Sequence, residues 1–376
     1  MNHKHLLAGV AVAALMTTGT AFAASHGGGQ DQLAAQAAMI DALSKKVEAL
    51  SAGETVGKGV KGVSLKISGQ VNRAVFYGSD ANGNSFFNYV DNDASSTRVR
   101  WDAEAPMGDS LKVGSRLEME MESNTSLRTG AVGGAGGDVF AARQAYVYIS
   151  GGFGTLSTGH QSEASDGVLH NSFNYASLAD INPEFTAGTL GLAGARLPSF
   201  ADGGRVDSIQ YATPTIAGFK AAVSIEDQGQ LTAQGSYSGE FSGIGVLAGI
   251  GYEAEQGATD AQMGMSGGLN FGPVALNGAM AFNLDDSAGG SDKFFYWVSL
   301  AHKGSYIDLG PTSLAIDFGN ANGVIDGIGS FISVGFGVVQ RVAPGADMYF
   351  SIRHFAEGDR GVDSAQAALA GMRIVF

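Results

Sequence analysis

From residue 63 onward, apolar and polar residues alternate along the chain with the period of two that is typical of β-strands. Over 98–104, for example, Val99, Trp101 and Ala103 alternate with arginines and acids. Apolar side chains therefore share one face of each predicted strand, and charged side chains share the other. A water-soluble sandwich would show the same alternation, so the pattern predicts strands without identifying what surrounds them.

The number of these segments and the lengths of their connections favour one architecture. Short connections such as 106–109, 151–152, 213–214 and 272–273 alternate with longer ones rich in Gly, Asn and Asp. An even strand number with this rhythm is typical of bacterial outer-membrane barrels. The sequence therefore predicts an all-β fold, a 16-stranded antiparallel transmembrane β-barrel over 63–376. The sixteen predicted strands are 63–77, 96–105, 110–122, 139–150, 153–160, 205–213, 216–226, 229–238, 243–254, 260–271, 273–284, 292–302, 312–319, 329–341, 346–356 and 365–376.

One connection is far longer than a turn. The stretch 161–204 shows no sustained alternation. A loop of that length inside a compact protein usually has a function. We therefore expect this loop to contribute to the functional site.

The first residues have the features of an export signal. Lys4 provides a positive start, residues 6–16 are a short apolar run, and Ala21-Phe22-Ala23 fits the small-x-small cleavage pattern. We interpret 1–23 as a signal peptide that is removed to leave Ala24 as the mature start. The alternative is an N-terminal anchor that is retained.

The segment 24–62 has a different period. Apolar residues recur at seven-residue intervals between Leu33 and Leu50, over three repeats, as in a coiled coil. The following stretch, 53–62, is rich in Gly and Lys and reads as a linker. We interpret 24–62 as a periplasmic, coiled-coil-like α-helical segment with a linker. A single amphipathic helix lying against the barrel or the membrane is the alternative.

Composition supports a membrane barrel. Hydrophobic residues make up 44% of the chain and charged residues only 15%, with 57 Gly, 7 Pro and no Cys. Beyond the signal no apolar run approaches the roughly 20 residues of a membrane-spanning helix, and a barrel spans lipid with alternating residues instead. The net charge is −14, or −15 once the segment containing Lys4 is removed. That sign disfavours nucleic-acid binding, but it does not determine the ion selectivity of a pore.

Several stretches resemble the trimeric general porins of Gram-negative outer membranes, and they occur in the order found in that family. They correspond to the opening strands, to the strand pair before the constriction loop, to the acidic tip of that loop and to the strand after it. The C-terminal Phe376 is similar to the terminal aromatic residue that serves as an assembly signal. The matching stretches are 63–74, 95–99, 143–147, 152–159, 180–185 and 205–211.

The resemblance implies a homotrimer of 16-stranded barrels, each with its third loop folded into the pore. It also implies a transverse field, from loop acids facing wall arginines. Asp180 and Glu184 match the loop acids, whereas Arg98, Arg143 and Arg205 match the wall arginines. The chain departs from the pattern at Gln70, where some members have lysine, and this weakens the expectation of strong anion preference.

The residues themselves support this assignment in part. Arg98 lies on the polar face of its strand, and a lipid-facing arginine near the midplane would cost about 2–4 kcal/mol. Strict alternation places Arg143 with the small Ala145, and Tyr146 and Tyr148 on the other face. The alternative is that these arginines pin the loop through salt bridges, and both roles are compatible. Further candidates for lining the pore are Gln70, Arg100, Arg116, Glu163 and Asp166.

We therefore expect a porin for passive diffusion of small hydrophilic solutes and ions, in the cell outer membrane. The alternatives are a tether whose N-terminal helices contact peptidoglycan, and a substrate-specific porin. We predict no catalytic residues or cofactor, because no nucleophile–base pair is evident in the sequence. We also predict no metal site, because His160 and His170 form no recognised ligand pattern. The expected partners are two further copies of the chain, outer-membrane lipid and lipopolysaccharide, and the barrel-assembly machinery acting through Phe376.

Overall fold

The computed structural model describes the chain from residue 62 onward, with gaps. The predicted signal peptide, the predicted helical segment up to residue 61 and Glu184 lie outside the described residues. The described residues are 62–128, 140–181, 190, 192, 202–227, 229–254, 261–284, 294–325, 328–357 and 364–376.

The chain divides into two compact units. The described residues of the smaller unit are 62–66 and 102–106, where the Ser64 hydroxyl donates a hydrogen bond to the carbonyl oxygen of Glu104 at 3.2 Å. The larger unit comprises 67–101 and 107–376, and it contains the candidate site. No helix within the described residues is both long and apolar enough to cross a membrane.

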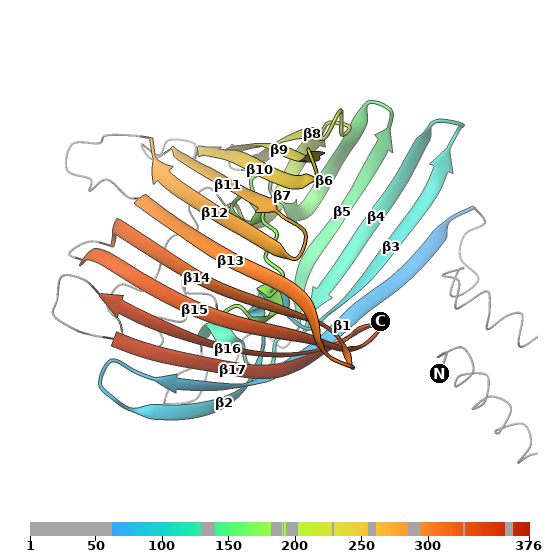
Figure 1. Cartoon of the computed structure of the whole chain (residues 1–376). Coiled ribbons are helices and arrows are strands. Elements are labelled where there is room, and N and C mark those ends of the chain that lie inside the picture. The colour runs from blue at the N-terminus through green and yellow to red at the C-terminus, as the bar shows by residue number, and fades with distance from the viewer. Residues whose placement is uncertain are drawn as a thin grey trace, which may run out of the picture. The chain divides into compact units, whose positions relative to one another are not determined.

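The described residues contain seventeen strands in one sheet, and the recorded strand pairs are antiparallel. Figure 1 shows β10 to β17 lying side by side. The strands are β1 (Ser64–Ser79), β2 (Ser85–Asp91), β3 (Arg98–Met107), β4 (Leu111–Glu120), β5 (Ala141–Gly151), β6 (Gly154–Ser162), β7 (Arg205–Ala212), β8 (Phe219–Glu226), β9 (Leu231–Phe241), β10 (Ile244–Ala254), β11 (Gln262–Asn270), β12 (Val274–Asn283), β13 (Phe294–Ile307), β14 (Gly310–Ile325), β15 (Ile328–Ala343), β16 (Ala346–Glu357) and β17 (Ser364–Val375).

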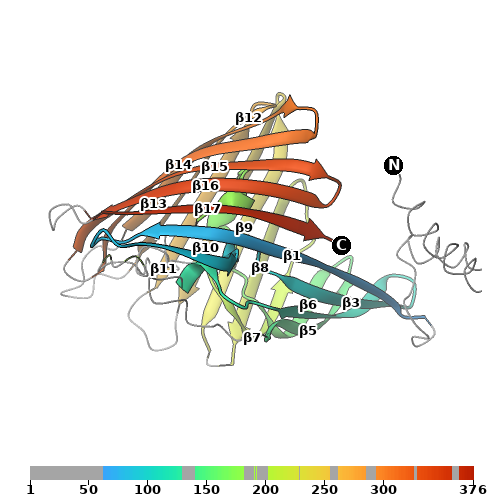
Figure 2. The ribbon, with the colours of Figure 1, turned by 90° about the horizontal axis from the view of Figure 1, so that it is seen from below.

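Strand β1 closes the sheet into a barrel. One edge of β1 pairs with β17, from Gln70 opposite Val375 to Ser79 opposite Gln366, and Figure 2 shows the two strands adjacent. The other edge pairs with β2 and also with β3. Since β2 and β3 are separated only by a short interruption and follow the same edge of β1, they occupy one strand position. The seventeen segments therefore form a closed 16-stranded barrel, which confirms the predicted strand number.

Each of the sixteen predicted segments overlaps one observed strand, and β2 is the additional one. In β2, Phe86 and Val90 are buried, while Phe87 and Tyr89 are 71% and 78% exposed. Apolar side chains thus occupy both faces of this strand, so it lacks the polar alternation that identified the others. The 3-10 helix η1 (Asp93–Ser95) separates it from β3.

The two faces of the barrel differ in the way a lipid environment requires. On β13, Val298 and Leu300 are about half exposed, whereas their neighbours Ser299 and Ala301 are buried. The same inversion recurs on β16, where Ile352 is exposed and Arg353 is buried. Large apolar groups therefore face outward and polar or small groups face inward, as in outer-membrane barrels.

A β-bulge on β5 corrects one prediction about side-chain direction. Glu118 lies opposite Gln144, but the next residue, Met119, lies opposite Ala142, so Arg143 is the extra residue of the pair. A bulge of this kind changes the alternation of the strand on one side of it. Strict alternation through this segment is therefore wrong.

The bulge places the tyrosines of β5 on the inner face together with Arg143. Tyr146 lies opposite Arg116, whose guanidinium carbon is 6.0 Å from the centroid of the tyrosine ring. Tyr148 follows two residues later and shares that face, whereas Ala145 is exposed on the other. The predicted pairing of Arg143 with small inward residues is thus replaced by bulky aromatic neighbours.

The lipid-facing position of the outward side chains leads to a first prediction. Replacing Leu300 in the middle of β13 with arginine should destabilise the folded barrel by about 2–4 kcal/mol, because the charge faces hydrocarbon. The matched variant Ile307→Arg, at the end of the same strand, should cost about 0–1 kcal/mol. Denaturant unfolding in lipid vesicles measures both, and equal costs would contradict the assignment of β13 to the membrane.

Candidate pore constriction

The segment 163–181, which follows β6, lies against the inner face of the barrel wall. Its 3-10 helix η3 (Val168–His170) contacts β10, β11 and β12. The hydroxyl of Ser266 donates a short hydrogen bond to the carbonyl oxygen of Val168, whose side chain is fully buried. Gly251 permits this approach, since a Cβ there would lie 2.9 Å from a methyl carbon of Val168.

Further along, the same segment contacts β12 again and then other strands of the wall. The backbone N–H of Phe173 donates to Oδ1 of Asn277 on β12 at 2.7 Å. The 3-10 helix η4 (Ser177–Ala179) then contacts β15, β16 and η1. There Asn92 donates from Nδ2 to the carbonyl oxygen of Leu178 at 2.8 Å. Segment 163–181 is therefore held by the wall at several separate points.

A further attachment is an ion cluster centred on Arg353 of β16. The Arg353 side chain is 5% exposed. Its Nη2 lies 2.7 Å from Oδ1 of Asp180 in segment 163–181, and its Nη1 lies 2.7 Å from Oδ1 of Asp317 on β14. Ser333 also accepts from Nη1 at 2.6 Å. Gly335 leaves the necessary space, because a Cβ there would lie 2.5 Å from both Arg353 Nη2 and Asp317 Oδ2.

Asp180 is therefore positioned by an arginine that the sequence analysis did not single out. No hydrogen bond or ion pair recorded for the described residues joins Asp180 to Arg98, Arg143 or Arg205. The period-two alternation gives one indication of Arg353, because Arg353 lies on the same inward face of β16 as the buried Tyr349. The pairing itself spans 173 residues, and no local pattern reports it.

The predicted wall arginines form a second cluster with acids of the wall itself. Glu118 on β4 has a side chain that is 1% exposed, and it lies 3.4 Å from Arg98 Nη1 and 2.9 Å from Arg143 Nε. Arg100 donates to the same carboxylate from Nε at 2.6 Å. Arg143 also pairs with Glu120 at 2.8 Å. The arginines are therefore largely neutralised in place by carboxylates on the neighbouring strand.

The third predicted arginine contacts the start of segment 163–181. Arg205 Nη2 lies 3.8 Å from Oδ2 of Asp166. Nearby, the Gly204 N–H donates to Oε2 of Glu163 at 2.7 Å. Burial raises the pKa of both Glu163 and Asp166 from the ordinary value of each carboxyl group. These contacts correspond to the pinning role that the sequence analysis offered as the alternative for Arg205.

Two other candidates have structural partners. Gln70 is buried and donates from Nε2 to the carbonyl oxygens of Ser95 and Ser96 at 2.8 and 2.7 Å, so it clamps η1 to β1. Arg116 stacks over Tyr146, as described above. The described residues contain no grouping of three or more His, Asp and Glu side chains that could hold a metal.

A closed barrel with an apolar outside and a charged, loop-covered inside defines an outer-membrane channel. A sequence model described as Gram-negative porin matches residues 9–360, and the chain belongs to this family. The family identifies a channel rather than an enzyme.

Solved structures show the same fold at low identity. An anion-selective porin from Comamonas acidovorans is 18% identical, with a TM-score of 0.60 over 84% of this chain and 100% of that chain. OmpT of Vibrio cholerae, in a trimer form, is 18% identical, with a TM-score of 0.58 over 84% and 100%. The channel DcaP of Acinetobacter baumannii is 14% identical, with a TM-score of 0.58 over 86% and 100%. No curated protein matches the sequence significantly.

The Arg353 cluster makes a second prediction. Arg353→Met removes the buried cation from the partly exposed carboxylates of Asp180 and Asp317, so the barrel should lose about 1–3 kcal/mol of unfolding free energy. Segment 163–181 should also detach, and single-channel conductance should rise. Asp180→Asn keeps the pair between Arg353 and Asp317, so its loss of stability should be smaller. It removes the ion pair that attaches segment 163–181, so conductance should still rise. Unchanged conductance in both variants would contradict the role of the cluster.

The raised pKa of Glu163 leads to a third prediction, about the pH dependence of stability. A raised pKa means that the folded channel holds the Glu163 proton more tightly than the unfolded chain does. The stabilisation is thus present at low pH and is lost as pH rises above 4.5 through the raised pKa. Glu163→Gln should therefore match the native chain in stability at low pH and exceed it at higher pH. Parallel stability curves over pH 4–8, obtained by denaturant unfolding, would refute this.

Proposed function

We propose that the chain forms a weakly selective channel for small hydrophilic solutes and ions, narrowed by segment 163–181 folded into the barrel as the third loop. The observation that carries the proposal is the pairing of charge on the inner face. Near the proposed constriction, the described residues include five arginines paired with five carboxylates. They are Arg98, Arg100, Arg143, Arg205 and Arg353 with Glu118, Glu120, Asp166, Asp180 and Asp317.

Balanced charges produce little net preference for cations or anions, but separated rows still generate a local field. In the proposed constriction Asp180 and Glu184 provide the acidic side, and Arg98, Arg143 and Arg205 the basic side. Such a field orients dipolar solutes and disfavours apolar ones, which cannot replace the water they displace. The side chain of Asp180 remains 39% exposed despite its ion pair, which leaves it able to act on a solute.

The proposal extends to assembly. We infer a homotrimer, by analogy with the trimer form of the Vibrio cholerae protein. The 24–62 segment, as a periplasmic helical segment, would then bring three helices together. A short heptad stretch is marginal alone, and the barrel contacts would supply the remaining stability.

Ion selectivity tests the proposed function. In planar bilayers separating two KCl concentrations, the reversal potential should lie close to zero, because the paired charges of the proposed constriction favour neither ion strongly. Arg353→Met should shift the potential toward cation selectivity, since it removes a positive charge beside two carboxylates. A native reversal potential near the Nernst limit of either ion would contradict a weakly selective pore.

A further inference from the structure

A separate pocket lies near the short-turn ends of β13 to β17. It is a cavity of about 270 Å³, and its lining includes Tyr175, Lys303, Ser313, Arg341, Asp347 and Arg373. Asp347 precedes Arg353 by six residues on β16, which corresponds to about 20 Å along a strand. The pocket is therefore distinct from the ion cluster of the proposed constriction.

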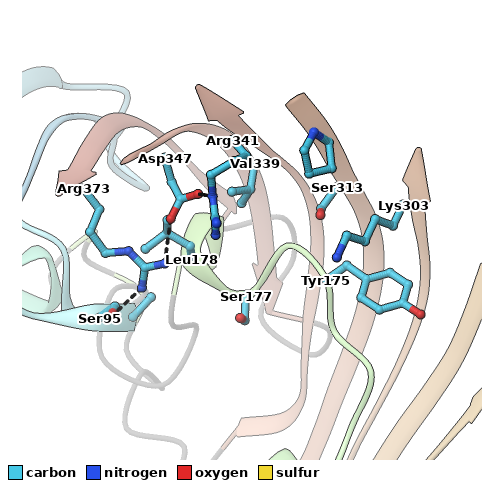
Figure 3. A pocket seen from close by; sticks show the side chains of 12 residues that line it. Ser95, Tyr175, Ser177, Leu178, Lys303, Ser313, Val339, Arg341, Asp347 and Arg373 are labelled. Atoms are coloured by element: carbon cyan, nitrogen blue, oxygen red, sulfur yellow. Dashed lines mark hydrogen bonds and ion pairs between the residues drawn. The ribbon is translucent and has the colours of Figure 1, made fainter. Parts of the chain in front are cut away.

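One side of this basic pocket is a preorganised arginine pair. Asp347, whose side chain is 3% exposed, accepts from Arg341 Nε at 2.5 Å and from Arg373 Nη2 at 2.8 Å. Arg373 also donates from Nη1 to the hydroxyl of Ser95 at 3.2 Å. Both carboxylate oxygens are thus engaged, so the carboxylate fixes the two guanidinium groups in place. Figure 3 shows this cluster with its dashed contacts.

The arginine pair retains unused binding capacity. The side chain of Arg341 is 47% exposed, and the contacts recorded for it among the described residues use Nε and not the terminal nitrogens. The side chain of Arg373 is 22% exposed, and each of its terminal nitrogens has a second N–H beyond the contacts with Ser95 and Asp347. A guanidinium with free terminal N–H groups binds carboxylates and other oxyanions well.

The other side of the pocket carries a second cation. Lys303 lies on the inward parity of β13 with the buried Ser299 and Ala301, and its Nζ lies 5.9 Å from the centroid of the Tyr175 ring. No carboxylate within the described residues lies at ion-pair distance from it. In Figure 3 Lys303 and Tyr175 lie across the pocket from the arginine cluster, with the lysine directed toward the space between.

The charges are strongly unbalanced, in contrast to the constriction. Lys303, Arg341 and Arg373 face a single carboxylate, Asp347, so the pocket has a net charge of about +2 at neutral pH. Hydroxyl groups of the lining, including that of Ser313, can donate further hydrogen bonds. The cationic groups lie on two sides of a cavity that is larger than one small inorganic ion requires.

We propose that the basic pocket binds small organic dianions whose two anionic groups are separated by a short carbon chain, such as short dicarboxylates. One carboxylate pairs with the free face of Arg341 and Arg373, and the other pairs with Lys303. The pocket is partly open to water, so binding is weak and reversible, and it forms a resting point for a permeating anion. This goes beyond the proposed function, because a pore with balanced constriction charges contains no such site by default.

Concentration-dependent current block tests the proposal with the full-length channel in planar bilayers. Succinate and glutarate should block the current saturably, whereas acetate at the same ionic strength should not. Lys303→Met and Arg341→Gln should each raise the half-blocking concentration by about tenfold, the usual effect of losing one charge-assisted contact. Lys220→Met, the same change at an exposed position at the start of β8, should leave it unaltered.

Three results would overturn the proposal. The first is equal block by acetate and succinate, which would mean that no site distinguishes a dianion. The second is an unchanged half-blocking concentration in both pocket variants. The third is tighter binding of inorganic phosphate than of any dicarboxylate, which would indicate a single compact anion site. The KCl reversal potential from the same bilayers reports on the proposed function separately, so failure of one idea is distinguishable from failure of the other.

Discussion

The structure depends on one constraint, which is that backbone N–H and C=O groups cannot remain unpaired in the hydrocarbon of a membrane. The chain satisfies this by pairing β1 with β17 on one edge and with β2 and β3 on the other. Closure leaves no sheet edge facing lipid. It also divides all strand side chains into two environments, and the outward apolar groups and the inward polar groups follow from that division.

The charged side chains of the inner face then have to be accommodated without destabilising the barrel. Glu118 is almost fully buried among three arginines, and Arg353 is buried between two acids. Buried charges of this kind are stable only when they are paired and hydrogen-bonded. The pairing also attaches segment 163–181 to the wall through Asp180. The same contacts therefore stabilise the barrel and attach the segment, and under the proposed function they also balance the charge along the path of a solute. The basic pocket is the contrasting case, where the charge is left unbalanced.

Most of the barrel could be predicted from the sequence, because period-two alternation reports directly on a two-sided strand. The exceptions have physical causes. Strand β2 has apolar residues on both faces, and the bulge at Arg143 reverses parity through a single extra residue. Less of the candidate site could be predicted from the sequence. Alternation identified Arg98 and Arg143 as inward, but it could not show that Glu118 neutralises them or that Arg353 binds Asp180, since these contacts are set by register and loop path. The positions of Glu184 and of the N-terminal segment stay predictions.

Segment 163–181 should rest on the inner wall in the conducting channel as well. A disulfide between Ala179→Cys and Gly337→Cys tests it directly, because the chain has no native cysteine and a Cβ at Gly337 would lie 3.2 Å from that of Ala179. This spacing is near the Cβ separation of roughly 3.5–4.5 Å found in disulfides. We expect the bond to form readily on oxidation and the single-channel conductance to be the same before and after reduction. Failure to form the bond, or a conductance that changes when the bond is reduced, would show that the segment leaves the wall in the conducting channel.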